Sequence, residues 1–393
     1  MEAYAGDWIQ LLLRWVHLIT GVAWIGSSFY FVWLDNSLHA PLDQRDGDKG
    51  IGGELWAVHG GGFYQVHKYR VAPAVLPETL HWFKWEAYWT WMSGFALLVA
   101  LYYVHADSYL VDRSVANIAG WQAVAISVVL LLAGWLFYDQ LCKRAGFGHE
   151  RWVGVAMIVF VGIVAYGLSH VFSGRGLYIQ VGAMLGTIMV GNVRFVIIPS
   201  QRALVSAKQR GEAPDPIHGQ RGKQRSIHNN YFTLPVLFLM ISNHYPMTYG
   251  HDHAWLIMMA MLLLAAFVRH FFNLRHKGRI VWAIPAAAMA ATIALAIAIA
   301  PTRNAASAAP EFAQVQAIVS ARCVSCHAHT PVQAGIASAP KDVLLDSPAA
   351  IRVNAPRIQQ QAVASRAMPL GNITGMTQAE RDVLGAWFAR GAP

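Results

Sequence analysis

The sequence is poor in charge and in cysteine. Charged residues make up 13% of the 393 residues, well below the share of roughly 25% in soluble globular proteins. Three cysteines cannot form the disulfide framework that supports small secreted domains. The chain begins with acidic Glu2 and Asp7, and no small-residue cleavage site follows a short apolar core. We therefore expect no cleaved signal peptide, so the first apolar segment should remain in the protein.

The net charge of +9 does not indicate a nucleic-acid-binding protein. The Lys and Arg residues lie in short loops between apolar segments, where they act as topology signals. A nucleic-acid-binding surface would instead group basic side chains with stacking aromatic side chains on a soluble domain. The sequence has no such group, which excludes nucleic acid as a partner.

Long apolar segments are abundant, and 55% of the residues are hydrophobic. A helix needs about 20 residues to cross roughly 30 Å of hydrocarbon. We predict an all-α polytopic helix bundle with eight spans, over residues 8–34, 87–104, 119–138, 152–172, 176–199, 228–244, 253–273 and 280–300. Short matches in a common order, such as LLLA at both Leu130–Ala133 and Leu262–Ala265, favour two parallel four-helix halves.

The basic residues predict the orientation of this bundle. They concentrate in the loops after the first, third, fifth and seventh spans, whereas the opposite loops hold only Arg113 and Arg175. The positive-inside rule therefore places both termini outside the cytoplasm. Residues 302–310, TRNAASAAP, have the composition of a flexible linker that few contacts should cross. The predicted organisation is a membrane domain at 1–301, a linker at 302–310 and a soluble domain at 311–393.

The soluble domain carries Cys323-Val324-Ser325-Cys326-His327, a C-x-x-C-H motif typical of covalent haem attachment. The two thiols can add to the two vinyl groups of one haem, and His327 then ligates the iron. A redox motif would need a βαβ context and a zinc site would need a second pair of ligands, and neither pattern is present. The sequence therefore predicts a haem c bound by Cys323, Cys326 and His327.

The other features of this domain follow the order of a class I cytochrome c. A helix is predicted from Phe312 to Ala321, before the motif. Met368, followed by a proline, is the predicted second axial ligand, with Met376 and, less favourably, His329 as rivals. A capping box at Thr377–Glu380 predicts the start of a final helix.

Two groups of polar residues lie within the predicted spans, where ionisable residues usually have a function. In the first span, His17 is a candidate ligand for a haem b, with Arg14 one turn away as a partner for a propionate. The segment RWVHLITGVAWIGSSF resembles the first helix of small haem b membrane proteins such as the oxygen-independent protoporphyrinogen oxidases. His170 is the preferred trans ligand and His105 a poorer one, while a plain interhelical hydrogen bond from His17 is the alternative.

The second group lies toward the cytoplasmic side and is rich in arginine, amide and imidazole side chains. Arg194, Asn229 and Arg269 are the predicted substrate-binding residues, with Asn192, His228, Asn230 and His270 nearby in the spans. A basic, amide-rich pocket with aromatic walls suits a planar anion. The alternative is that each of these side chains simply extends toward the membrane interface.

Three runs, GGELWAVHGGGFY, LPETLHWFKWEAYWTWMSGF and HNNYFTLPVLFLMISNHYP, resemble the bacterial integral-membrane urate hydroxylases over essentially the whole chain. The resemblance implies oxidation of urate to 5-hydroxyisourate, with electrons leaving through the fused cytochrome and no hydrogen peroxide formed. It implies a lipid-embedded protein of the bacterial inner membrane, with the cytochrome in the periplasm. A soluble cytochrome c or a terminal oxidase would then accept the electrons.

In this interpretation Glu86, His228 or His270 is the general base that helps water to attack the oxidised purine. Two other functions stay open at this point. One is a respiratory carrier that takes electrons from a quinol and does no purine chemistry. The other is a transporter with a fused redox sensor, which would move its substrate without forming a product.

Overall fold

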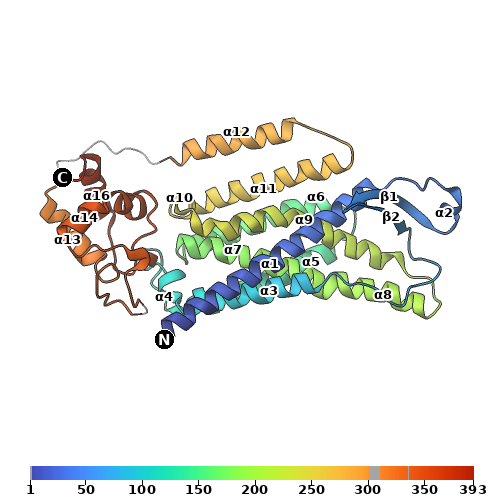
Figure 1. Ribbon diagram of the computed structural model, residues 1–393, viewed down its shortest axis with the longest axis horizontal. Helices are drawn as coiled ribbons and strands as arrows, with labels where there is room; N and C mark the ends of the chain where they lie inside the picture. Colours follow the sequence, from blue (N-terminus) through green and yellow to red (C-terminus); the bar gives the residue numbers. More distant parts are fainter. Residues whose placement is uncertain (1, 301–309, 335) are drawn as a thin grey trace.

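The computed structural model describes residues 2–300, 310–334 and 336–393. These residues form an elongated molecule with three parts (Figure 1). A bundle of long helices occupies the middle, a β-hairpin projects from one end, and a small helical domain lies at the other end. The N-terminus lies at the same end of the bundle as the small domain.

The bundle contains a helix for each of the eight predicted apolar segments, and α8 (Ile198–Gln209) continues the fifth of them. These helices are α1 (Glu2–Ser37), α3 (Trp85–Leu97), α5 (Gly120–Ala145), α6 (Glu150–Ser169), α7 (Gly174–Gly191), α8 (Ile198–Gln209), α9 (Pro216–Ile241), α11 (Ala254–His276) and α12 (Ala283–Ala298). A π-helical segment, Leu98–Tyr103, extends α3, and another, Asn192–Ile197, joins α7 to α8 in one continuous rod. The connections hold α4 (Ala106–Tyr109), a 3-10 turn (Ser242–His244) and α10 (Pro246–Tyr249).

Among the described residues, five helices are long and apolar enough to cross a membrane. They cover Tyr4–Ser37, Gly120–Ala145, Glu150–Ser169, Gly174–Gln209 and Ala254–His276. These five fit a membrane protein, and each coincides with a predicted span. The other three predicted spans are helical too, but α12 is shorter, α3 continues as a π-helix, and α9 begins with a polar half. Eight spans therefore remain a prediction.

The all-α prediction is wrong for the loop that follows α1. This loop forms the short helix α2 (Gln44–Asp48) and an antiparallel hairpin of β1 (Ile51–His59) and β2 (Gly62–Tyr69). Gly60 and Gly61 make its two-residue turn, with φ of 57° and 81°. A type I′ hairpin turn needs positive φ at both positions, which glycine adopts without steric cost. The sequence Gly60-Gly61 therefore indicates a hairpin turn at this position.

The centre of the bundle is α7. In the apolar stretch of the rod Gly174–Gln209, which begins with α7, 56% of the residues are buried, against 28% or less in the apolar stretches of the other four long helices. Small residues let the neighbouring α5 approach it closely: a Cβ on Gly134 would lie 2.6 Å from Met184, and one on Gly191 only 2.5 Å from Trp135. Because such distances are far below van der Waals contact, glycine is needed at both positions for α5 and α7 to pack as they do.

The C-terminal domain follows the predicted order of elements. It contains α13 (Phe312–Arg322), α14 (Pro348–Val353), α15 (Ala355–Ile358) and α16 (Gln378–Ala389), with a π-helical segment (Gln359–Ala364) and 3-10 turns at Pro340–Asp342 and Leu370–Asn372. The capping box is confirmed, because Thr377 and Glu380 exchange side-chain-to-backbone hydrogen bonds at the start of α16. Val315, Leu384 and Trp387 are buried in one hydrophobic core between α13 and α16.

Contrary to the expectation of few contacts, the C-terminal domain docks on the bundle through residues 365–372. Gly371 lies against α4, where a Cβ would come within 2.6 Å of the Ser108 carbonyl oxygen. Gly250, after α10, is packed just as tightly against the backbone of Ser365. Arg366 forms an ion pair with Asp252. The linker composition carried no information about this contact, since it is made by residues far from the linker.

The core of the C-terminal domain provides a stability test. Trp387 is 1% exposed and contacts Phe312 across the core. Trp387→Ala should lower the free energy of unfolding of this domain by about 3–5 kcal/mol, because it leaves a large cavity. Hydrogen-exchange protection of the α13 and α16 amides in the full chain measures the loss. Val353→Ala, at a residue 79% exposed in the same domain, should change protection by less than about 0.5 kcal/mol. Equal effects of the two substitutions would contradict this account of the core.

Candidate functional site

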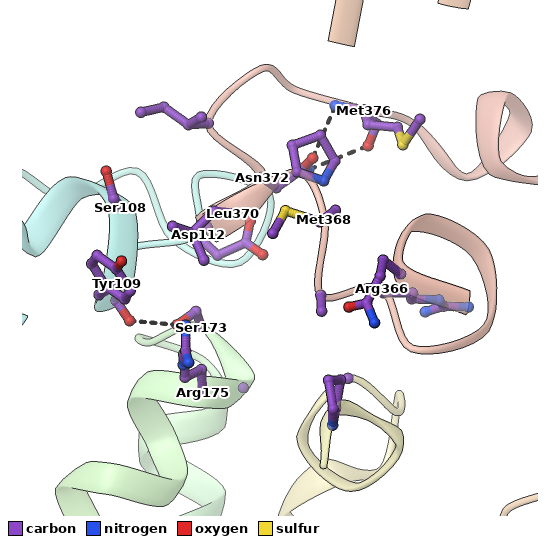
Figure 2. Close-up of a pocket in the computed structure, with 18 of the residues that line it drawn as sticks. Ser108, Tyr109, Asp112, Ser173, Arg175, Arg366, Met368, Leu370, Asn372 and Met376 are labelled. Atoms are coloured by element: carbon purple, nitrogen blue, oxygen red, sulfur yellow. Dashed lines mark hydrogen bonds between the residues drawn. The ribbon is translucent and has the colours of Figure 1, made fainter. Parts of the chain in front are cut away.

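A cavity of about 1310 Å³ lies where the C-terminal domain meets the bundle. Cys323, Cys326 and His327 line it from the C-terminal domain, and Tyr109 and Arg175 line it from the bundle. Figure 2 shows the loop with Met368 and Leu370 facing Ser108, Tyr109 and Asp112 across this space. The cavity exceeds the usual 300–1,000 Å³ range of small-molecule sites, so it has room for a large planar group.

His327 has one ring nitrogen fixed by the backbone, as a histidine that bound a haem iron would need. Its Nδ1 donates to the carbonyl oxygen of Val343 at 2.9 Å. A metal-ligating histidine usually has its second ring nitrogen fixed in this way, which sets the tautomer and leaves Nε2 free to bind the metal. The residues present therefore fit a haem that is held through Cys323 and Cys326 and ligated by His327.

Cys323 does not have the environment of a redox-active cysteine. Burial raises the pKa of the Cys323 thiol to about 12. Catalytic C-x-x-C motifs do the opposite, because they lower the pKa to stabilise a thiolate at neutral pH. This environment favours thiols that serve as attachment points over thiols that exchange electrons.

The rival ligands on the opposite wall differ in position. Met376 is 3% exposed and belongs to the hydrophobic core, whereas Met368 is partly buried at its edge, although both line the cavity. Arg381 donates to the backbone carbonyl of Met368 at 2.7 Å and so holds the loop in place. His329 is exposed and paired with Asp346 at 2.7 Å, which makes it a poor ligand. The geometry favours Met368, which stays a prediction.

A buried polar network joins α5, the rod of α7 and α8, and α9. Arg225 is 4% exposed and pairs with Asp139 at 2.9 Å. Asn192 donates to the Tyr138 hydroxyl at 3.1 Å and to Asn229 Oδ1 at 2.8 Å. The Tyr138 hydroxyl also lies 2.8 Å from Nδ1 of His228. Two of the predicted site residues, Asn229 and His228, therefore belong to one network.

A separate pocket of about 290 Å³ lies between α1, α9 and α11, toward the hairpin end of the bundle. Its walls are the aromatic side chains of Phe29, Trp33 and Phe272, and it also contains Arg269 and His276. Both Nη2 of Arg269 and Nδ1 of His276 are buried there without a hydrogen-bond partner. A cation and an imidazole nitrogen thus lie between aromatic walls, which suits a planar anion.

Arg269 is held in this pocket by two contacts. Its Nε donates to Oδ1 of Asn230 at 2.6 Å, and Asn230 in turn donates to Asn273 at 3.0 Å. Its guanidinium lies over the Phe29 ring, 3.8 Å from the ring centroid. With only 3% of its surface exposed, Arg269 is a buried cation without a carboxylate partner among the described residues. A bound anion would supply the missing charge.

The remaining predicted residues of this region lie elsewhere. Arg194 is exposed, with its guanidinium near Phe195, so it does not join the pocket or the network. Glu86 is half-buried at the start of α3. His270 lies one residue from Arg269 but pairs with the Tyr231 hydroxyl at 2.7 Å and stacks on that ring. The three predicted bases are therefore in three different surroundings.

The structure does not bring His17 and His170 together. His17 points into the interface of α1 and α3, where its Nδ1 lies 2.9 Å from the Thr90 carbonyl oxygen and its ring contacts Gly94. His170 is exposed at the end of α6 and is bonded to the Tyr166 carbonyl oxygen of its own helix. Arg14 is exposed on α1. These residues do not fit a haem b shared by the two histidines, and the interhelical hydrogen bond describes His17 well.

Sequence reasoning missed several residues of these sites. Tyr138, Asp139 and Arg225 form the middle of the network, and His276 lines the pocket. The sequence shows Asp139 and Arg225 as charged residues at the ends of apolar segments. It does not show that they pair, because the pair joins α5 to α9, which are far apart in the chain. Phe29 and Trp33 lie four residues apart on α1, so the sequence indicates that they share a helix face. It does not distinguish this face from the other apolar faces of the bundle.

Comparison with known proteins gives one family match. A family model described as urate oxidase N-terminal matches residues 3–300, about three quarters of the chain. This region contains the whole helix bundle and the hairpin, and it stops before the C-terminal domain. No curated protein and no solved structure matches the chain.

The buried pair in the network can be tested by stability. Arg225→Met should destabilise the bundle by about 3 kcal/mol, because it removes a buried cation from Asp139 and Asn192. Lys143 also pairs with Asp139, at 2.6 Å, but its side chain is 62% exposed. Lys143→Met should therefore cost less than about 1 kcal/mol. Denaturant unfolding of the detergent-solubilised protein compares the two, and equal losses would rule out a special role for Arg225.

Proposed function

Because the chain belongs to the urate oxidase N-terminal family, we propose that it is a membrane oxidoreductase that oxidises urate to 5-hydroxyisourate. In this reaction urate and one water give 5-hydroxyisourate, two protons and two electrons. The electrons go to the C-terminal domain and then to an external acceptor, either a soluble cytochrome c or a terminal oxidase. Oxygen is not the direct acceptor, so no hydrogen peroxide is formed.

The observation that carries this proposal is that Nη2 of Arg269 is buried in an aromatic pocket without a hydrogen-bond partner. Urate is a planar anion whose ring can stack on Trp33 or Phe272 while an oxygen accepts from Nη2 of Arg269. Asn230 holds Nε of Arg269, so the guanidinium is already oriented before the substrate binds. Such preorganisation limits the ordering cost of binding.

A proton acceptor is needed when water adds to the oxidised purine. His276 lines the pocket and has a buried Nδ1 without a partner, which makes it better placed than Glu86, His228 or His270. His228 has its own unpartnered Nε2, but it lies in the network on α5 and α9. We therefore assign the base role to His276, with His270 as the neighbouring alternative on α11.

The C-terminal domain supplies the electron acceptor in this proposal. A haem c attached to Cys323 and Cys326 and ligated by His327 and Met368 would provide one-electron chemistry at the outer end of the bundle. Tyr109, Ser173 and Arg175 of the bundle line one side of the cavity, so a haem bound there would lie directly against the bundle. The proposed location is a bacterial inner membrane, with this domain in the periplasm.

Arg269 provides a test of the substrate pocket. Arg269→Met should weaken anaerobic urate binding by roughly 10- to 100-fold, because a charge-assisted hydrogen bond contributes about 1.5–3 kcal/mol. Equilibrium dialysis with labelled urate measures this effect independently of electron transfer. Arg275→Met, at an exposed arginine on the same helix, is the control and should bind urate normally. Unchanged binding by Arg269→Met would move the substrate site elsewhere.

The haem ligands provide a second test. A pyridine haemochrome assay on the purified protein should find haem c, and Met368→Ala should abolish methionine ligation and lower the iron potential. Met376→Ala should keep methionine ligation, although it removes a core side chain. The reverse pattern would make Met376 the ligand. The same assay counts haem b: a b-type band that is lost in His17→Ala would support a membrane haem at that residue after all.

A further inference from the structure

The short helix α2 and the hairpin lie at the end of the molecule opposite the C-terminal domain (Figure 1). Three of their side chains converge there. They are Asp46 on α2, Glu54 on β1 and His67 on β2, and their ligand atoms lie within 4.8 Å of one another. The backbone places Glu54 and His67 directly opposite each other in the hairpin register. This group is separate from the aromatic pocket and from the cavity under the C-terminal domain.

The buried carboxylate of Glu54 needs a cation nearby to compensate its charge. Glu54 is 1% exposed, and one of its oxygens accepts from the Leu42 backbone N–H at 3.1 Å. Its other oxygen faces Nε2 of His67 at 3.6 Å and the amide of Gln65 at 3.4 Å. Lys49 is bonded to the far oxygen of Asp46, at 2.8 Å, so it does not neutralise Glu54. A buried carboxylate without a cationic partner is costly unless it binds a metal.

His67 provides an independent observation. Its Nε2 has no accessible surface and no hydrogen-bond partner, and it points between the two carboxylates. An imidazolium donor would approach a carboxylate oxygen to about 2.7–2.9 Å. The observed separations are 3.6 Å to Glu54 and 3.9 Å to Asp46. Those separations leave a space between the three atoms that a direct ion pair would close.

The shorter of these separations, 3.6 Å, is that of neighbouring ligand atoms on one metal ion, and the longer one, 3.9 Å, requires the Asp46 carboxylate to move slightly inward. Bonds of about 2.0–2.2 Å in a tetrahedron put neighbouring ligand atoms about 3.3–3.6 Å apart. A neutral imidazole with two carboxylates is a donor set suited to a divalent ion of intermediate softness, and three protein ligands leave one position for water. We infer that Asp46, Glu54 and His67 form a zinc site that fastens α2 to the hairpin.

Such a site would explain how this extension keeps a defined shape. An isolated two-stranded hairpin is only marginally stable in water. The strands here expose Trp56, Phe63 and Tyr64, so little of their apolar surface is buried to hold them. One ion bound by α2, β1 and β2 would fix all three elements together. This role does not depend on the proposed oxidation of urate.

The test uses the full chain with an affinity tag that contains no histidine. The protein is stripped with EDTA, loaded with zinc chloride alone, passed through a desalting column and analysed by inductively coupled plasma mass spectrometry. We expect one zinc per chain, counted separately from any haem iron. Asp46→Asn and His67→Ala should each weaken zinc binding by more than about 100-fold, since even loss of an outer-shell partner costs 10–100-fold.

His59→Ala, at an exposed histidine on the same hairpin, is the matched control and should still bind one zinc. Zinc should also slow amide exchange in residues 51–69 of the wild type by at least about tenfold, and it should not do so in Asp46→Asn. Asp46→Asn keeps the shape of the side chain, so it serves if His67→Ala fails to fold. The proposal is overturned if the wild-type protein retains no zinc. It is also overturned if Asp46→Asn and His67→Ala bind zinc as tightly as His59→Ala does.

Discussion

The functional interpretation of the bundle depends on one constraint: a cation buried among apolar helices must be compensated. Arg225 meets this constraint internally, through Asp139 and the amide of Asn192. Arg269 meets it only in part, because Asn230 occupies its Nε while Nη2 faces a pocket with no partner. The first arginine therefore stabilises the fold, and the second is available to a ligand. This difference separates two residues that look alike in the sequence.

The two proposed sites lie at opposite ends of the bundle. The pocket with Arg269 lies toward the hairpin end, and the cavity with His327 lies at the other end. Along α11 alone, Ala254 and Arg269 are fifteen positions apart, which corresponds to about 22 Å. Electrons from the proposed oxidation must cover a distance of this order within the bundle. The histidines predicted to hold a haem between them do not meet, so the structure offers no support for that particular relay.

The docking of the C-terminal domain has a direct structural consequence. The loop that carries Met368 is the same loop that contacts α4 and pairs with Asp252 through Arg366. The predicted iron ligand and the docking surface are thus only two residues apart in the chain. Any shift of the domain on the bundle would move Met368, so domain position and ligand geometry are coupled.

The sequence by itself determined the features that depend on local pattern. Apolar length located the helices, and the Thr377–Glu380 capping box located the start of α16. The C-x-x-C-H spacing marked the residues that line the cavity of the C-terminal domain, and their role in haem attachment stays a prediction. Each of these signals arises from neighbouring residues whose physics acts over one or two helical turns. The hairpin turn at Gly60-Gly61 belongs with them, although it was not recognised.

Only the tertiary structure decided which polar residues meet. It placed Arg194 outward and Arg269 inward, joined Tyr138 to His228 across 90 positions, and brought Asp46, Glu54 and His67 to one point. It also showed that His17 bonds to α3 and that residues 365–372 dock on α4 and α10. These outcomes depend on the rotation and packing of whole helices. This packing cannot be deduced from the composition of each apolar segment, because it is set by shape complementarity between residues far apart in the chain.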